Sequence, residues 1–489
     1  MNFPNHPRYV PGASIQVRPL GFAVDCARAY RLISAGSRYS FWLDSARPES
    51  PMSRYSYLGV VPAEGRVLIS DDAREPVYRE LNGSGQEVGR VPGSLDRGLS
   101  TYLAQGPAVN GAPGQLGEAL LGGYVGYFGY EYRARTEPGS PVTHSSPTPD
   151  GAWLQAVRYM LYDHQGGQSW LVGDTAWLDA IEAALCDYAG EESTAPPTAG
   201  ADAQPMSGLV FSPPTRTDYT ADVRTCQQEI ADGKSYEICL TAQTQASAVT
   251  PVSPEQALAT YLLQRQHNPA PYAAFIHCDS FYILSSSPER FLTISPAGQV
   301  ETKPIKGTIE RTDDPLEDAR RAYWLAHDPK TRAENLMIVD LLRNDLSRIS
   351  YPESVRVPVL MGVESYQTVH QLVSTVQAQM RPQVGRVEAA LACFPGGSMT
   401  GAPKPSTMDI IDRLEGRARG IYSGALGFFS ATGAVNLSIV IRALVISSSG
   451  QVSLSAGGAI VADSDPDAEY EEMLTKLAAA LPPQLGRLG

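Results

Sequence analysis

Alternating apolar and polar residues predict β-strands along both halves of the chain. In the first half, short alternating runs lie between turn-forming residues. Residues 122–130 combine aromatic side chains with glycine, which favours a strand against which another backbone packs closely. The predicted strands are 39–43, 55–58, 66–69 and 122–130 in the first half, and 236–241, 272–276, 281–286, 438–446 and 452–455 in the second.

Apolar residues spaced three or four apart predict two helices in the second half. Residues 218–232 carry Val223, Cys226 and Ile230 on one face, and residues 333–349 show the strongest helical periodicity of the chain. The pattern at 372–376 does not distinguish a strand from mixed structure. Strands and helices do not alternate as a clean βαβ repeat, so the sequence predicts an α+β fold with large antiparallel sheets.

A change of composition divides the chain. Residues 189–215 are dominated by Pro, Ala, Gly, Ser and Thr, which is typical of an exposed connector. It would separate an N-terminal region, 1–188, from a catalytic region, 216–482. No internal repeat of 20–50 residues is apparent.

Composition narrows the class of protein. The 489 residues are 43% apolar and carry a formal charge of −13, which indicates a globular protein and disfavours nucleic acid as a partner. An anionic small molecule stays possible, because a few local cations can override a distant net charge. Six scattered Cys, no signal peptide and no apolar run of roughly 18 residues predict a cytoplasmic protein without a membrane partner.

Acidic residues form the first candidate site. Glu334 lies near the start of the predicted helix 333–349, and residues 464–467 form a helix start with an Asp or Ser cap and Pro in the first turn. That second helix carries Glu469, Glu472 and Lys476 on one face. Carboxylates converging from two helices suit Mg²⁺, although on spacing alone a solvated acidic face is the commoner explanation.

Glycine-bearing segments and cations complete the candidates. Residues 393–404 and 455–460 can present backbone N–H groups to an anion, although each is also a sequence typical of a tight turn. Arg442 interrupts an apolar run and, if buried, needs an anionic partner from the protein or from a ligand. Lys306 would have a lowered pKa if desolvated, or is simply an exposed turn lysine. His370 orients a substrate or is a core imidazole.

Together these segments resemble the chorismate-utilising enzyme family, which includes component I of anthranilate synthase and of aminodeoxychorismate synthase. The matching motifs occur in the family's order, and the ordered set is far more specific than any single match. They are 286–290 (SSPER), 304–308 (PIKGT), 333–345 (AENLMIVDLLRND), 396–404 (GGSMTGAPK), 421–424 (IYSG), 439–442 (IVIR) and 456–464 (AGGAIVADS), with weaker likeness at 54–59 and 122–127.

The resemblance implies a two-lobed antiparallel β-sandwich with helices packed outside. It also implies a Mg²⁺ site, bound chorismate and an acid that helps the 4-hydroxyl to leave. By motif position, Glu334 and Glu472 would ligate the metal with Glu469 close behind, and Glu289 would be the acid. His370 would lie at the reacting ring. The residues that bind the substrate or line its pocket would be Arg442, Tyr422, Lys476, Gly457, Gly458, Thr308 and Ser398.

Two positions distinguish branches of the family. Where water-adding members carry a Lys base, this chain has Glu237. Where anthranilate-forming members read Pro-Ile-Ala-Gly-Thr, it has Lys306, as in the aminodeoxychorismate-forming branch. There the Lys amine attacks C2 of chorismate, after which ammonia attacks C4 and expels it. The resemblance thus implies amination at C4, toward p-aminobenzoate and folate.

The source of ammonia and the alternatives follow from the same resemblance. No Gly-x-Cys-x-Gly elbow is present, so a separate glutamine amidotransferase subunit is expected to supply ammonia. The alternatives are an anthranilate synthase component I, the same reaction in antibiotic biosynthesis, and a silent scaffold subunit, which the acidic ligands Glu334 and Glu472 disfavour.

Pro271 and Tyr272 resemble part of the family's tryptophan site, but its partner motif at 41–45 is altered, which makes tryptophan feedback doubtful.

Overall fold

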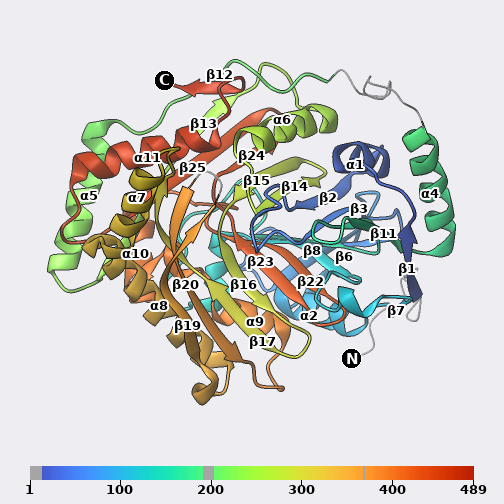
Figure 1. The fold of residues 1–489 in the computed structure, drawn as a ribbon, viewed down its shortest axis with the longest axis horizontal. Coiled ribbons are helices and arrows are strands. Elements are labelled where there is room, and N and C mark those ends of the chain that lie inside the picture. Colours follow the sequence, from blue (N-terminus) through green and yellow to red (C-terminus); the bar gives the residue numbers. More distant parts are fainter. Residues whose placement is uncertain (1–13, 191–202, 367–368) are drawn as a thin grey trace.

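The computed structural model describes residues 14–190, 203–366 and 369–489, and within them two twelve-stranded sheets dominate (Figure 1). The centre of the predicted connector, 191–202, lies outside the described residues. The first sheet runs, in spatial order, through β21 (Gly401–Ala402), β13 (Glu237–Ser247), β25 (Gln451–Ile460), β24 (Ala443–Ser447), β15 (Phe281–Ser287), β14 (Tyr272–Cys278), β2 (Tyr39–Asp44), β3 (Tyr55–Val60), β10 (Arg158–Asp163), β11 (Gln168–Gly173), β1 (Ser14–Leu20) and β7 (Ala108–Asn110).

The second sheet faces the first and is also built from both halves of the chain. Its neighbouring strands pair antiparallel, as do those of the first sheet apart from β1 with β7. The order is β18 (Ile305–Glu310), β20 (Val369–Gln379), β17 (Gln299–Lys303), β16 (Arg290–Ile294), β23 (Val435–Ile439), β22 (Ala425–Ser430), β8 (Gly123–Phe128), β9 (Gly151–Gln155), β4 (Arg66–Ser70), β5 (Val77–Asn82) and β6 (Glu87–Pro92), with β19 (Arg356–Ser365) also paired to β20.

Helices cover the outer faces of both sheets, which gives four layers. The outer face of the first sheet packs on α1 (Cys26–Ser34), α4 (Thr175–Gly190), α5 (Arg216–Ala231), α6 (Pro254–His267), α10 (Lys404–Glu415) and α11 (Pro466–Ala480). The second sheet packs on α2 (Leu95–Ala104), α8 (Pro329–Ile349) and α9 (Arg386–Ala392), while α7 (Pro315–His327) lies beside β18, β19 and β20. None of the helices in the described ranges is long and apolar enough to cross a bilayer.

The side-chain alternation of each strand explains why both faces are buried. Phe41 of β2 points into the core between the sheets, and its neighbour Trp42 points outward to the helices. Phe428 and Phe429 of β22 do the same in the second sheet. Because successive strand residues face opposite sides, one strand stabilises two cores, and this accounts for the long apolar runs in the sequence.

The structure confirms the predicted α+β class and most predicted elements. The segment 372–376, ambiguous in sequence, lies within β20, and helix 333–349 begins earlier, at Pro329 behind the cap Asp328. The single strand predicted at 438–446 is wrong. β23 ends at Ile439 in the second sheet and β24 begins at Ala443 in the first, so the chain crosses between the sheets, with Arg442 at a φ of 52°.

A buried cluster around Arg419 ties the sheets to the N-terminal half. The guanidinium donates to Glu415 at 2.6 and 2.9 Å, to the carbonyl of Met399 at 2.6 Å and to the carbonyl of Cys239 in β13 at 2.7 Å. Glu131 accepts from the backbone N–H of Arg419 and from that of the next residue, each at 2.8 Å. The ion pair is 1% exposed on both sides, so its charges depend on each other and on these carbonyls.

Replacing Arg419 by Met should therefore destabilise the protein strongly. The change leaves Glu415 charged and buried without its partner, and we expect the free energy of unfolding to fall by about 3–5 kcal/mol. Denaturant unfolding followed by tryptophan fluorescence measures it. Arg216→Met is the control, because Arg216 pairs with Asp467 and Glu471 at the surface and should cost less than about 1 kcal/mol. Equal losses in the two variants would contradict the assignment.

Candidate active site

Lys306 and Glu237 form an ion pair that bridges the two sheets. Lys306 lies on β18, at the edge of the second sheet, and its Nζ donates to Glu237 Oε1 of β13 at 2.9 Å. The register of β18 against β20 shifts between Ile305 and Thr308, so Lys306 lies at an irregularity of the strand. The two side chains are 11% and 1% exposed, so the pair is enclosed by protein.

The charge state of Lys306 differs from the sequence prediction. Burial disfavours the ammonium and would lower its pKa, but the carboxylates of Glu237 and Glu334 outweigh burial, so the pKa of Lys306 is raised above its ordinary value. The expected lowered pKa is therefore wrong. The sequence around Lys306 leaves open whether the side chain is buried, and it does not reveal a carboxylate that arrives from the other sheet.

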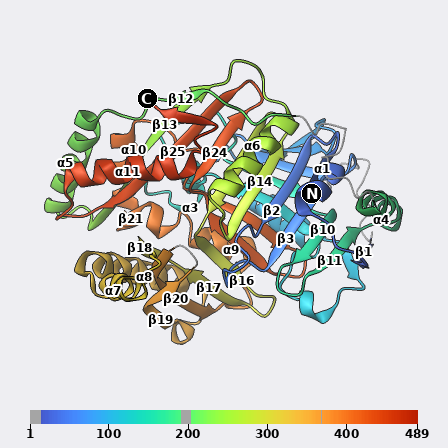
Figure 2. The same cartoon turned by 45° about the horizontal axis from the view of Figure 1, so that its top comes forward.

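Three carboxylates converge from α8 and α11 and are interleaved with lysines. Lys330 Nζ lies 3.2 Å from Glu469 Oε1 and 4.0 Å from Glu334 Oε1. On α11, Lys476 Nζ lies 2.7 Å from Glu472 Oε1. Figure 2 shows the layers that carry these groups, with α8 and β18 on one side and β25 and α11 on the other. The two helices predicted to share an acidic pocket do meet.

The donor set fits a hard divalent cation. Burial raises the pKa of Glu334, and nearby Glu237 and Glu472 raise it further, so these anions repel one another. A Cβ at position 458 would lie 3.0 Å from Glu469 Oε2, so Gly458 leaves room beside the carboxylates. Among the described residues no three His, Cys, Asp or Glu side chains are grouped for ligation. Metal binding would require Glu334 and Glu472, with Glu469 close behind, to exchange their contacts with Lys330 and Lys476 for the cation.

Glu289 is a buried carboxyl suited to holding a proton. Burial raises its pKa, against the opposing effects of Ser398, Lys306, Lys476 and Arg442. Ser398 Oγ donates to Glu289 Oε1 at 2.8 Å and so fixes its orientation. The residue predicted as the acid thus lies in the surroundings that an acid needs.

Arg442 presents a positive charge toward the same group. Burial lowers the pKa of Arg442, Arg47 lowers it further, and Glu289 opposes them. In the described part of the chain no carboxylate lies within ion-pair distance of this guanidinium, so the structure leaves it available to an anionic ligand. Nearby, Lys476 Nζ donates to the carbonyl of Gly457 at 2.8 Å, which joins α11 to β25.

Three predicted residues lie in separate networks. His370 contacts Ser365 Oγ through Nδ1 at 2.7 Å and Asp318 Oδ1 through Nε2 at 3.0 Å. Thr308 accepts from the side chain of Gln371 at 3.4 Å. Tyr422 is buried close to Arg419, and burial raises the pKa of its hydroxyl. Across the described ranges no hydrogen bond or ion pair joins these three residues to Lys306 or to Glu334, Glu469 and Glu472.

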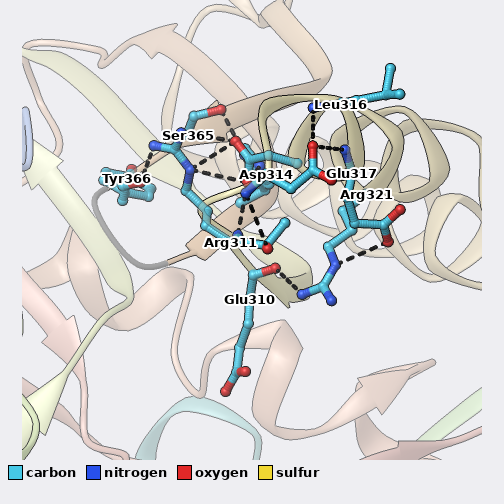
Figure 3. Close-up of polar contacts among 11 residues, drawn as sticks. Glu310, Arg311, Asp314, Leu316, Glu317, Arg321, Ser365 and Tyr366 are labelled. Carbon is cyan, nitrogen blue, oxygen red and sulfur yellow. Dashed lines mark hydrogen bonds and ion pairs between the residues drawn. The ribbon is translucent and has the colours of Figure 1, made fainter.

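The surroundings of His370 are strongly charged. The Arg311 guanidinium, which donates to Asp318 and to the carbonyl of Tyr366, holds the pKa of Asp318 down, to about 2. Figure 3 shows Arg311 between Tyr366 and the residues that begin α7. Asp318 is therefore a permanent acceptor for the imidazole N–H, and it fixes the ring's position.

Sequence analysis does not identify Lys330 as a candidate, and it assigns no catalytic role to Glu237. Lys330 pairs with Glu469 on another helix and lies 4.0 Å from Glu334 on its own, and the i,i+4 spacing to Glu334 is the local signal that could have marked it. Glu237 is an acid at the start of an apolar strand, which is the signal that could have assigned it. Pro271 and Tyr272, which resemble part of the family's tryptophan site, line a cavity of about 510 Å³ between the sheets, and Lys306 does not line it.

Comparisons with known proteins identify the family of this chain. A family model described as chorismate binding enzyme matches residues 91–482. An aminodeoxychorismate synthase of Streptomyces pristinaespiralis is 41% identical over 96% of this chain and 64% of its own length. Aminodeoxychorismate synthase component 1 of Escherichia coli K12 is 43% identical over 54% of this chain and 56% of its own length. The chain thus spans less than two thirds of either relative.

A solved structure supports the architecture. Anthranilate synthase component I from Streptococcus pneumoniae superimposes with a TM-score of 0.71 at 27% identity, covering 88% of this chain and 93% of that one. The two-lobed sandwich with outer helices is therefore the fold of this chain.

Removing the Ser398 hydroxyl should raise the pKa of Glu289 further. The hydrogen bond from Ser398 favours the charged carboxylate, so Ser398→Ala should shift the titration of Glu289 to higher pH. Infrared difference spectroscopy of the protonated carboxyl band across a pH series measures the shift. Ser398→Thr keeps a hydroxyl and should titrate like the wild type. A downward or absent shift in Ser398→Ala would contradict this interaction.

Proposed function

The chain belongs to the chorismate binding enzyme family, and on that premise we propose that it is the chorismate-aminating component of an aminodeoxychorismate synthase. The observation that carries the proposal is Lys306, a buried amine in Pro-Ile-Lys-Gly-Thr whose Nζ donates to the Glu237 carboxylate of the other sheet. The Streptomyces and E. coli relatives support the same assignment.

Substrate binding would use the cations at the junction of the sheets. Chorismate carries two carboxylates, which Arg442 and Lys476, with the backbone of Gly457 and Gly458, would hold. Glu334 and Glu472, with Glu469 close behind, would hold Mg²⁺. That ion, when bound, compensates the charge of one substrate carboxylate and of the departing oxygen. Thr308, Ser398 and Tyr422 would line the pocket, and His370 would approach the reacting ring.

The chemistry would proceed by two displacements. The neutral amine of Lys306 attacks C2 of chorismate, the ring double bonds shift, and the 4-hydroxyl leaves as water with the proton of Glu289. Ammonia then attacks C4, the double bonds shift back and the C2–Nζ bond breaks. Glu289 takes the surplus proton from the new C4 amine. The product is 4-amino-4-deoxychorismate, with its enolpyruvyl group retained.

Ammonia would come from a separate glutamine amidotransferase subunit, which we place with this chain in the cytoplasm. The E. coli relative is named component 1, which supports the existence of a second component. The product would serve p-aminobenzoate and folate synthesis. The likeness to an anthranilate synthase structure keeps that activity as the second candidate.

The first test identifies the product. Purified protein with chorismate, Mg²⁺ and ammonium should form aminodeoxychorismate without releasing pyruvate, as measured by chromatography and mass spectrometry. Without ammonium, the wild type should accumulate a protein adduct with the mass of chorismate less one water, and Lys306→Ala should not. Anthranilate with stoichiometric pyruvate would instead support the second candidate, and an unimpaired Lys306→Ala variant would remove Lys306 as nucleophile.

The second test concerns the metal ligands. Glu334→Gln removes one anionic oxygen donor, so we expect a roughly 10-fold or greater rise in the Mg²⁺ concentration needed for half-maximal turnover. Mg²⁺ titration calorimetry on the same variant should show matching weaker binding. Glu353→Gln, which alters an exposed acid in a surface turn, is the control and should not change either value. An unchanged Mg²⁺ requirement in Glu334→Gln would contradict the ligand assignment.

A further inference from the structure

Glu237 is a fully buried carboxylate with one oxygen unaccounted for. Its Oε1 accepts from Lys306, while Oε2 has no hydrogen-bond partner in the described residues. Its backbone is fixed, because Glu237 pairs with Ala402 of β21 and its carbonyl accepts from Ser235 Oγ at 2.9 Å. A buried, half-satisfied acid that is held in place is costly to keep, so it calls for a functional explanation.

The nucleophile assigned to Lys306 presents a chemical problem that Glu237 can solve. An ammonium has no lone pair, and the acidic surroundings of Lys306 favour the ammonium. The titratable groups that act on Lys306 come from four directions. They are Glu237 and Cys239 on β13, Glu334 on α8, Glu289 ahead of β16, and Glu472 on α11. Of these, Glu237 alone lies within hydrogen-bond distance of Nζ in the described structure.

We propose that Glu237 is the proton acceptor that converts Lys306 into a nucleophile and the donor that restores it. The proposal rests on the proposed function. In the first displacement, Glu237 takes a proton from the Lys306 ammonium and the freed lone pair forms the Nζ–C2 bond, which leaves a secondary ammonium. In the second, the Nζ–C2 electron pair returns to nitrogen as the bond breaks, and the neutral amine takes the proton back from Glu237.

The pair makes the supply of neutral amine independent of the solvent pH. The ammonium–carboxylate form and the amine–carboxylic acid form hold the same number of protons, so the second arises from the first without exchange with water. If Glu237 is replaced by Gln, neutral Lys306 requires loss of a proton to solvent. The rate of adduct formation should then rise with pH, which the wild-type rate should not do.

The experiment measures single-turnover adduct formation without ammonium, between about pH 6 and 9. The wild-type rate should be flat. Glu237→Gln should be about 100-fold slower near neutral pH, the size typical of a lost general base, and should climb with pH. Glu237→Asp keeps a carboxylate and should stay flat at a reduced rate. Gln245→Ala, an exposed change on the same strand, is the control and should match the wild type.

Two outcomes would overturn the proposal. One is a flat profile in Glu237→Gln, and the other is an equal loss at every pH that Glu237→Asp does not restore. A wild-type measurement covers the case in which the Gln variant does not fold. Chorismate without ammonium should produce one new infrared band from protonated Glu237 beside the loss of the band of protonated Glu289, and a loss without a new band would reject the role of Glu237. If the wild type forms no adduct at all, the proposed function has failed, not the role of Glu237 alone.

Discussion

The candidate active site depends on a buried ion pair that holds the backbone beside it. Arg419 and Glu415 neutralise each other in the interior and use their remaining hydrogen-bonding capacity on backbone from β13 and from the loop at Met399. Because Cys239 is two residues from Glu237, the Arg419 cluster fixes the strand that carries the partner of Lys306. Breaking such a pair leaves an uncompensated charge, so geometry at the site is coupled to the stability of the whole fold.

The lysines at the candidate site are each paired with a carboxylate, and Arg442 is left to pair with a ligand. Lys306 pairs with Glu237, Lys330 with Glu469 and Lys476 with Glu472. Arg442 is the cation left for a ligand in the described structure. Under the proposed function, a dianionic substrate and a divalent cation would enter this array by exchanging partners with the lysines. The overall charge of −13 gives no hint of such a local balance.

Much of the fold follows from local sequence, and the site follows only in part. Period-two alternation locates β2, β3 and β4, and the cap at residues 464–467 locates the start of α11, because these signals act within a few residues. The spacing of Glu469, Glu472 and Lys476 likewise predicts that they share one helix face. The crossover at Arg442 was not, because the segments before and after it are both apolar and differ only in which sheet they join. The raised pKa of Lys306 depends on Glu237, 69 residues earlier in the chain. Contacts at that separation leave no mark in a local pattern.

Each large sheet contains an internal seam where the two regions of the chain meet. In the first sheet β2 pairs with β14, and in the second β8 pairs with β22. Each seam is an antiparallel ladder, and its backbone donors and acceptors would be left open on both fragments if the regions were separated. Such edges are adhesive, so a fragment made alone would expose two templates for aggregation. The two regions thus act as obligate halves of one folding unit, and a duplication, truncation or fusion that preserves the fold must keep both strands of each seam.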